Sequence, residues 1–333
     1  MEVGRQFNDK IMRVIIIGSG QLGSRHLQGV LKNKSTEEVW IIDEWRSSLE
    51  LAFQRSKEIS HFATLHFEEG FINLPIEADL CIVAGTANVR LSCCQEVLSR
   101  TKIKYLVLEK ILFNSLPDFH SAEILFNKFP EMKIWVNHAR RMFPFYREVK
   151  KQFQVLKRNR LSVEVSGSEW GLACNALHFI DLWCFLRETE LSHVDFDHAL
   201  NSIIESKRRE FIEVRGLVKV QFSNGDEMSL ISEISKEYMP ISINVKGENC
   251  EFLINEQEHF YFKDLLTNSI MVEGRMDYQS DLSSSLVSYS LNGHDFLLTP
   301  IGDSLPMHRI FIASAVDWYN SVLNRADLFI PIT

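Results

Sequence analysis

The sequence predicts an α/β fold in which a doubly wound parallel sheet is followed by an α+β domain with an open, largely antiparallel sheet. Three observations predict it. The first 137 residues alternate apolar runs with helix-forming stretches, a glycine-rich turn joins the first run to the first helix, and the strands after about residue 150 alternate apolar with polar residues. Continuous apolar strands are typical of a parallel sheet covered by helices on both faces, whereas alternation indicates a sheet with one uncovered face.

The first half is expected to wind strand, helix, strand in regular order. The expected strands are 13–17, 39–42, 80–84, 105–108 and 133–137, and the expected helices are 22–32, 46–56, 89–99 and 117–128. This order predicts parallel pairing, because each helix carries the chain back to the start of the next strand.

The second half is expected to be built on hairpins. The expected strands are 161–166, 214–223, 227–235, 241–246 and 251–254, with helices at 175–186 and 307–323. Asn224-Gly225 lies between two of these strands and favours a tight hairpin. We therefore expect a first domain over 1–137, an α+β substrate and oligomerisation domain over 138–306, and a C-terminal segment, 307–333, whose helix packs back on the first domain.

Composition limits the class of protein. The chain of 333 residues has 36 Lys and Arg against 44 Asp and Glu, a net charge of −8, which argues against nucleic-acid binding. The basic run Lys207-Arg208-Arg209 is expected to be a solvated helix end. No run of 18 apolar residues predicts a membrane span, and residues 1–10 lack the apolar core of a signal peptide. The six cysteines show no CxxC pair or metal-ligand spacing, which predicts no metal and a reducing cytoplasm.

Residues 18–23, GSGQLG, fit the G-x-G-x-x-G pattern that binds a dinucleotide between a strand and a helix. Gly18 permits the tight turn, Gly20 lets the backbone approach a pyrophosphate, and Gly23 lets helix and strand pack closely. Gln21 and Leu22 between them are expected to contact the cofactor. The free N–H groups of the following helix would face the phosphates. A methyltransferase that binds its nucleoside with the same glycines is the alternative.

Asp43 ends the second predicted strand, 20 residues after the last glycine of the loop. A carboxylate at this point accepts hydrogen bonds from the adenosine ribose and repels a 2′-phosphate, so NAD is expected in preference to NADP. Two alternatives remain open: Asp43 can be the cap of the next helix, and Arg46 can serve a 2′-phosphate.

Five blocks of the sequence together resemble the Gfo/Idh/MocA family of oxidoreductases. They are VIIIGSGQLGSRHLQGV, DLCIVAGTANVR (79–90), YLVLEKIL (105–112), WVNHARRMFPFY (135–146) and GLACNALHFIDL (171–182), and they cover nearly the whole chain in order. The resemblance implies a Rossmann domain followed by an open-sheet domain, and hydride transfer between NAD(P) and a sugar-type substrate. That class includes sugars, sugar phosphates, nucleotide sugars, nonulosonic acids and cyclitols.

The resemblance also implies roles for individual residues. Lys110 falls on the family's catalytic lysine, whose ammonium stabilises the reacting oxygen, and His178 on its histidine, which moves the proton. The resemblance places Thr86, Asn88 and Glu109 at the cofactor, and Asn137 and Arg141 at the substrate cleft. Cys174, Asn175 and Asp181, on the same predicted helix as His178, are also expected at the substrate. Asp181, three residues after His178, can orient the imidazole or be a structural acid. The alternative for Asn137 and Arg141 is packing between the domains.

Two positions depart from the family pattern. The proline that follows the family's lysine is Ile111 here, and a cis peptide bond before a residue other than proline costs about 2.5–4 kcal/mol, so we expect Lys110–Ile111 to be trans. Many relatives carry an aspartate four residues before the histidine, where this chain has Cys174. A neutral thiol cannot replace that carboxylate as a charge partner at pH 7.

These departures leave two hypotheses. The first is an NAD(P)-dependent dehydrogenase or reductase acting on CH–OH groups through Lys110 and His178. The second is a relative that binds nucleotide but has lost turnover and acts as a sensor or a partner-binding protein. Because one face of the second sheet lacks helices of its own in this family, we also expect a homodimer or a tetramer through that face.

Overall fold

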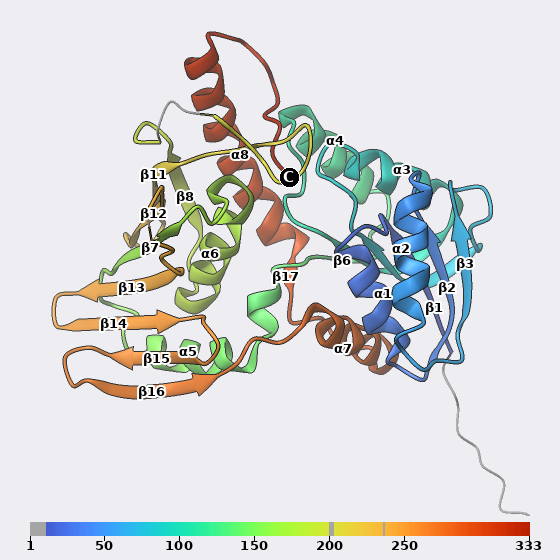
Figure 1. The fold of residues 1–333 in the computed structure, drawn as a ribbon, viewed down its shortest axis with the longest axis horizontal. Helices are drawn as coiled ribbons and strands as arrows, with labels where there is room; N and C mark the ends of the chain where they lie inside the picture. The colour runs from blue at the N-terminus through green and yellow to red at the C-terminus, as the bar shows by residue number, and fades with distance from the viewer. Residues whose placement is uncertain (1–10, 200–202, 236) are drawn as a thin grey trace, which may run out of the picture.

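The computed structural model describes residues 11–199, 203–235 and 237–333, and the N-terminal segment considered above as a signal peptide lies outside them. The first half of the chain builds six strands of a seven-stranded sheet, which we call sheet A, and a segment near the C-terminus adds the seventh (Figure 1). The strands are β1 (Met12–Ile17), β2 (Thr36–Ile42), β3 (Thr64–Glu68), β4 (Glu77–Val83), β5 (Lys102–Leu108), β6 (Lys133–Val136) and β17 (Thr299–Pro300). The helices between them are α1 (Gly23–Leu31), α2 (Arg46–Ser56), α3 (Arg90–Arg100) and α4 (Leu116–Phe126).

Sheet A has the strand order β17-β6-β5-β4-β1-β2-β3. The order reverses beside β1, because β2 pairs with one of its edges and β4 with the other, both in parallel. Ligands of doubly wound sheets bind at such a reversal, outside the carboxyl ends of the strands. The predicted Rossmann fold is confirmed, and β3 is a strand that the sequence analysis did not expect.

The second half is an eight-stranded sheet, sheet C, with the order β16-β15-β14-β13-β7-β12-β11-β8. Its strands are β7 (Ser162–Ser168), β8 (Leu191–Asp195), β11 (Gly216–Phe222), β12 (Glu227–Glu233), β13 (Ser242–Gly247), β14 (Cys250–Asn255), β15 (Phe260–Asp264) and β16 (Ser269–Gly274). All neighbouring pairs are antiparallel except β7 with β12. The hairpin predicted at Asn224-Gly225 is confirmed, since β11 and β12 pair across it and Gly225 has φ +84°.

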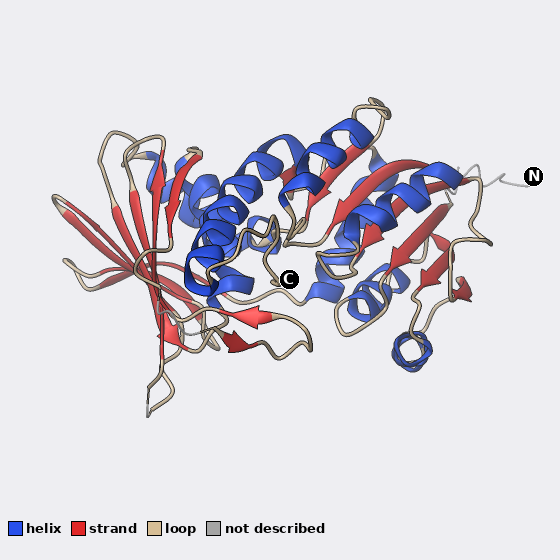
Figure 2. Ribbon diagram, turned by 90° about the horizontal axis from the view of Figure 1, so that it is seen from above, coloured by secondary structure: helices blue, strands red, loops and turns tan. Residues whose placement is uncertain are grey.

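In the described part of the chain, helices cover one face of sheet C and leave the other face without a helix (Figure 2). They are α5 (Pro144–Gln154) and α6 (Leu172–Arg187), which the short 3-10 helix η1 (Ala139–Met142) precedes. The alternating burial along β7 and β11 follows from this one-sided packing. A small separate pair, β9 (Ile204–Glu205) and β10 (Ile212–Glu213), lies outside sheet C.

After β16 the chain returns to sheet A before its last helix. Helix α7 (Gln279–Asn292) packs on α1, where a Cβ on Gly29 would lie 2.4 Å from the Ser280 carbonyl oxygen. Strand β17 then pairs antiparallel with β6, so the expected 138–306 segment includes two elements that pack on the first half. Helix α8 (Ile301–Leu323) begins before the expected residue 307 and contains Pro306.

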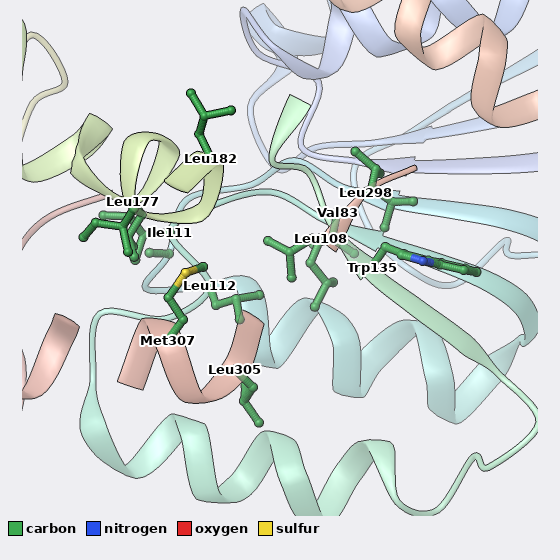
Figure 3. Packing of buried hydrophobic residues seen from close by; sticks show 14 of the residues in the cluster. Val83, Leu108, Ile111, Leu112, Trp135, Leu177, Leu182, Leu298, Leu305 and Met307 are labelled. Carbon is green, nitrogen blue, oxygen red and sulfur yellow. The ribbon is translucent and has the colours of Figure 1, made fainter. Parts of the chain in front are cut away.

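One buried cluster joins the two halves. Figure 3 shows Val83 and Leu108 from sheet A together with Leu112 from the loop after β5, Leu177 from α6 and Met307 from α8, all of which are buried. The loop after β5 is therefore packed on both sides, which holds Lys110 at the junction of the halves. Among the described residues, no helix combines the length and the apolar character that crossing a membrane requires.

Candidate active site at the junction of the two halves

The three glycines of the loop after β1 differ in what surrounds them. A Cβ on Gly18, which has φ +84°, would lie 2.4 Å from the Gly85 nitrogen, and one on Gly23 would lie 1.7 Å from the Gly18 carbonyl oxygen. A Cβ on Gly20 would meet nothing within 4 Å. The fold itself therefore requires Gly18 and Gly23, whereas Gly20 leaves open backbone at which a ligand can approach.

The loop is held by side chains from the neighbouring strand and helix. The Ser19 N–H donates to Asp43 Oδ2 at 2.7 Å, and the Trp45 N–H donates to Asp43 Oδ1 at 2.9 Å. Arg55 from α2 donates to the Gln21 carbonyl oxygen at 2.8 Å. Asp43 thus joins the glycine loop to the start of α2, so its carboxylate combines a structural role with a place in the pocket described next.

A pocket of about 480 Å³ opens over this loop. Of the residues predicted at the cofactor, those that line it are Gly18, Gly20, Gln21, Leu22, Gly23, Asp43 and Thr86. Asn88 does not line it and instead accepts a hydrogen bond from Thr86 Oγ1 at 2.7 Å. Arg46 does not line it either. An open cradle at Gly20, free N–H groups at the start of α1 and a carboxylate at the end of β2 fit a dinucleotide.

A second pocket of about 350 Å³ adjoins the first, and Leu22 lines both. Lys110, His178, Glu109 and Asn137 line this second pocket, so the structure brings the two predicted catalytic side chains together. Lys110 comes from the loop after β5 and His178 from α6. We refer to this space as the catalytic pocket.

Lys110 is held at the N-terminal turn of α6. Its ammonium donates to the Cys174 carbonyl oxygen at 2.9 Å, which leaves two N–H bonds for other partners. Burial lowers the pKa of Lys110 from its ordinary value. Beside it, burial would raise the pKa of Glu109, but hydrogen bonds from His26 and Asn137 outweigh burial and hold the pKa below its ordinary value.

The peptide bond between Lys110 and Ile111 is cis, so the expectation of a trans bond is wrong. That expectation used the local cost alone, whereas the segment is fixed by tertiary contacts. The buried Arg90 guanidinium donates to the carbonyl oxygens of Ile111 and Leu112, and to that of Gly85 in the neighbouring loop. The Ile111 side chain is fully buried.

Arg90 is a residue that the sequence analysis missed. It is 1% exposed, and burial lowers its pKa to about 10. Its three carbonyl partners belong to the loops that follow β4 and β5. One buried side chain therefore links these two loops by hydrogen bonds, and the loops flank the cofactor pocket and the catalytic pocket. Its sequence position, at the start of an ordinary-looking helix, gave no local signal.

His178 lies among other histidines. Its Nδ1 is buried with no hydrogen-bond partner among the described residues, and the His138 ring stands edge-on to it with centroids 6.0 Å apart. Burial lowers the pKa of His178 well below 6.5, and the charges of Lys110 and Arg140 add to the shift. The imidazole is therefore neutral at pH 7 and able to accept a proton.

A hydrogen-bonded pair of histidines lies behind His178. The Leu112 N–H donates to Nδ1 of His308 at 3.0 Å, so this imidazole carries its proton on Nε2 and donates it to His138 Nε2, also at 3.0 Å. Burial lowers the pKa of both rings well below 6.5. His308 is thus a core residue, neither a substrate contact nor a solvated helix end.

The structure does not bring four of the predicted substrate residues into the catalytic pocket. Arg141 forms a two-bond ion pair with Asp181, which is fully buried and also accepts from Thr299 Oγ1, so Asp181 does not orient His178. Asn175 donates to the Trp170 carbonyl oxygen at 2.7 Å. Cys174 meets Lys110 through its backbone only, and burial raises the pKa of its thiol to about 12.

The far wall of the catalytic pocket comes from residues that the sequence analysis did not select for the site. Arg140 donates to both carboxylate oxygens of Glu256 at 2.6 Å and stacks on the Phe179 ring. A neighbouring pocket of about 590 Å³ shares Glu256, Phe260, Met276 and Asp277 with it. No local pattern predicted these residues, because they lie after β14, at the start of β15 and after β16, and reach the site only through the fold.

Comparisons with known proteins agree with this architecture. The sequence matches no family profile and no curated protein. Among solved structures, myo-inositol dehydrogenase from Lactobacillus casei with NAD(H) and myo-inositol is similar, with TM-score 0.68 and 14% identity over 93% of this chain and 95% of that one. UDP-N-acetylglucosamine 3-dehydrogenase from Acidithiobacillus ferrooxidans gives TM-score 0.65 and 12% identity, covering 92% and 96%.

The transcriptional regulator Gal80p from Kluyveromyces lactis is also similar, with TM-score 0.67 and 13% identity over 94% of this chain and 93% of that one. At such identities the likeness concerns the fold. The parallel sheet with its glycine loop, the one-sided second sheet and the near-complete coverage of both chains agree on one architecture. This chain therefore has the two-domain fold of these solved structures, which agrees with the fold that the resemblance to the Gfo/Idh/MocA family implies.

Proposed function

We propose that this protein is an NAD-dependent dehydrogenase that oxidises a hydroxyl group of an uncharged sugar or cyclitol. The observation that carries the proposal is the meeting of Lys110 and His178 in one pocket that adjoins the glycine-loop pocket through Leu22. The NAD(H)-bound inositol dehydrogenase of the same fold supports the cofactor and the substrate class.

The cofactor would be held by the glycine loop, with the open backbone at Gly20 against its pyrophosphate and Asp43 at its adenosine ribose. NAD is preferred over NADP in this proposal, because the carboxylates of Asp43 and Glu44 line the pocket and would repel a 2′-phosphate. When bound, the nicotinamide would supply the acceptor for the hydride of the substrate carbon.

Two side chains of this chain would act on the reacting hydroxyl group. Neutral His178 accepts its proton, and the Lys110 ammonium donates a hydrogen bond to the oxygen as charge develops there. The bond from Lys110 to the Cys174 carbonyl oxygen orients the ammonium without using all its protons. The low pKa of His178 keeps it unprotonated over the neutral range.

The pocket walls support an uncharged substrate. Glu256 neutralises Arg140, and the adjoining pocket is lined by Glu256, Glu258, Asp277 and Asp281 against a single cation, Arg275, among the described residues. The negative charge of this adjoining pocket would repel sugar phosphates, nucleotide sugars and nonulosonic acids. The buried Asn137 Oδ1 has no hydrogen-bond partner among the described residues and would accept a hydrogen bond from a substrate hydroxyl group.

The test is NAD⁺ reduction, followed at 340 nm, on a panel of inositols, hexoses and their phosphates. We expect turnover on an uncharged member, loss of about 100-fold or more in kcat for Lys110→Ala and for His178→Ala, and unchanged NAD⁺ affinity in both variants. Arg147→Ala, outside the lining of both pockets, is the matched control. Tight NAD⁺ binding with no turnover on any substrate would replace this proposal with a nucleotide-dependent sensor, as the likeness to Gal80p allows.

The assembly is a separate part of the proposal. We infer a homodimer, or a tetramer built from dimers, through the face of sheet C that carries no helix (Figure 2). Light scattering should give at least twice the mass of 38.6 kDa, and a monomeric mass would contradict the inference.

A further inference from the structure

The basic run Lys207-Arg208-Arg209 is not the helix end that the sequence analysis expected. It lies in the loop of a small hairpin, between β9 and β10, whose pairs are Ile212 with Glu205 and Glu213 with Ile204. The Phe211 N–H donates to the Arg208 carbonyl oxygen at 3.2 Å and closes the turn. We call residues 204–213 the basic hairpin.

The basic hairpin is anchored at its base. The Ile212 N–H donates to the Pro331 carbonyl oxygen at 2.8 Å, and the Glu213 carboxylate accepts from the Ala173 N–H at 3.0 Å. The second contact lies in the first turn of α6, one residue from the carbonyl group that holds Lys110. The hairpin therefore belongs to the second half of the chain but is fixed close to the catalytic pocket.

Arg208 reaches from this hairpin into the pocket over the glycine loop. Of the three basic residues, only Arg208 lines that pocket, although it belongs to the other half of the chain. Its guanidinium is exposed and has no hydrogen bond or ion pair with any described residue. Lys207 and Arg209 are equally exposed and stand outside the lining.

The charges around the pocket show what Arg208 would meet. The other charged side chains among its described lining residues are Asp43, Glu44 and Glu69, all carboxylates. A pyrophosphate brought to the open backbone at Gly20 would find N–H groups there but no other cation in the lining. A free guanidinium is well suited to this place, because its planar fork donates two parallel hydrogen bonds to phosphate oxygens.

We propose that Arg208 binds the pyrophosphate of the dinucleotide, so that the second half of the chain supplies the cation for a cofactor held by the first. The proposal rests on the proposed function above. In this proposal the basic hairpin extends over the cofactor pocket. Cofactor binding would then be linked, through the base of the hairpin, to the start of α6, where Lys110 is held.

The test is calorimetric titration of NAD⁺, ADP and adenosine into the full chain and its variants. Arg208→Ala should weaken NAD⁺ and ADP by about ten- to a hundredfold, as expected for a hydrogen bond to a charged group, and leave adenosine unchanged. Arg208→Lys should retain part of the affinity, since the charge stays and the fork is lost. Lys207→Ala and Arg209→Ala are the matched controls and should bind NAD⁺ within about twofold of wild type, because solvent screens charges outside the pocket.

Three results would overturn the proposal. They are an Arg208→Ala variant with wild-type affinity for NAD⁺ and ADP, equal losses in all three alanine variants, and an equal loss for adenosine. If wild type itself binds neither NAD⁺ nor NADP⁺, the proposed function fails together with this inference; if wild type binds and Arg208→Ala does not differ, only this inference fails. Thermal unfolding of Arg208→Ala should match wild type, because the Arg208 side chain has no hydrogen bond or ion pair with a described residue that the variant would lose.

Discussion

Replacing Gly20 by alanine separates the needs of the fold from the needs of the ligand. The new Cβ would have nothing within 4 Å, and the φ of Gly20 lies outside the left-handed region that disfavours alanine. A glycine-to-alanine change at such a position stabilises a protein by about 0.4–1 kcal/mol through the unfolded state. We therefore expect a free energy of unfolding equal to wild type or slightly higher.

Nucleotide binding should respond in the opposite direction. A methyl group at Gly20 would stand where the pyrophosphate approaches the backbone and would cost at least one hydrogen bond to a charged phosphate, about 1.5–3 kcal/mol. That energy corresponds to a Kd for NAD⁺ raised about ten- to a hundredfold. Calorimetric titration gives the Kd, and urea unfolding gives the stability of the same preparation.

Gly23→Ala is the contrasting variant. Its Cβ would lie 1.7 Å from the Gly18 carbonyl oxygen, so the loop must move, and we expect a loss of about 1–3 kcal/mol in stability together with the loss of binding. Gly20→Ala with wild-type NAD⁺ affinity would refute the placement of the pyrophosphate. Gly20→Ala with stability as low as Gly23→Ala would refute the assignment of open space.

Two further predictions concern buried charge. The folded-state pKa values of His138, His178 and His308 lie below the unfolded value of 6.5. The folded protein therefore has its full stability above pH 6.5 and becomes less stable as the pH falls toward the folded pKa values. The free energy of unfolding should fall by about 1.4 kcal/mol per pH unit for each ring that stays neutral. Urea unfolding between pH 5 and 8 measures this, and a flat profile would contradict it. Asp226→Ala should lower the free energy of unfolding by about 3–5 kcal/mol, because it leaves the buried Arg187 guanidinium without its ion partner. NAD⁺ affinity, measured as a control, should not change, and a loss of stability below 1 kcal/mol would show that Arg187 finds another partner.

The local sequence pattern was sufficient to predict those features whose interacting residues are close together in the sequence. The glycine loop, the continuous strands of sheet A and the Asn224-Gly225 turn depend on residues within one strand and its turn, and all three are confirmed. The pairing of Lys110 with His178 followed from resemblance, because no spacing in the chain relates a residue after β5 to one on α6.

Elements stabilised by distant partners were missed. Helix α7 is rich in serine, a residue that competes with the helix backbone for hydrogen bonds, and it is held by close packing on α1 at Gly29. The buried Arg90 donates a hydrogen bond to the Ile111 carbonyl oxygen, 21 residues away in sequence. Asp181 was assigned to the site because it lies one turn from His178, but in the folded protein its carboxylate forms an ion pair with Arg141.

The return of the chain to sheet A through α7 and β17 makes the half built on sheet A discontinuous in sequence. Residues 144–274 are in effect an insertion, entered after β6 and left before α7. A fragment that stops at residue 137 would bare the backbone edge of β6 and the Gly29 side of α1, and a bare strand edge invites self-association. Exchange of the second half between relatives, by recombination or by design, therefore needs two joins placed in register, one on each side of the inserted segment.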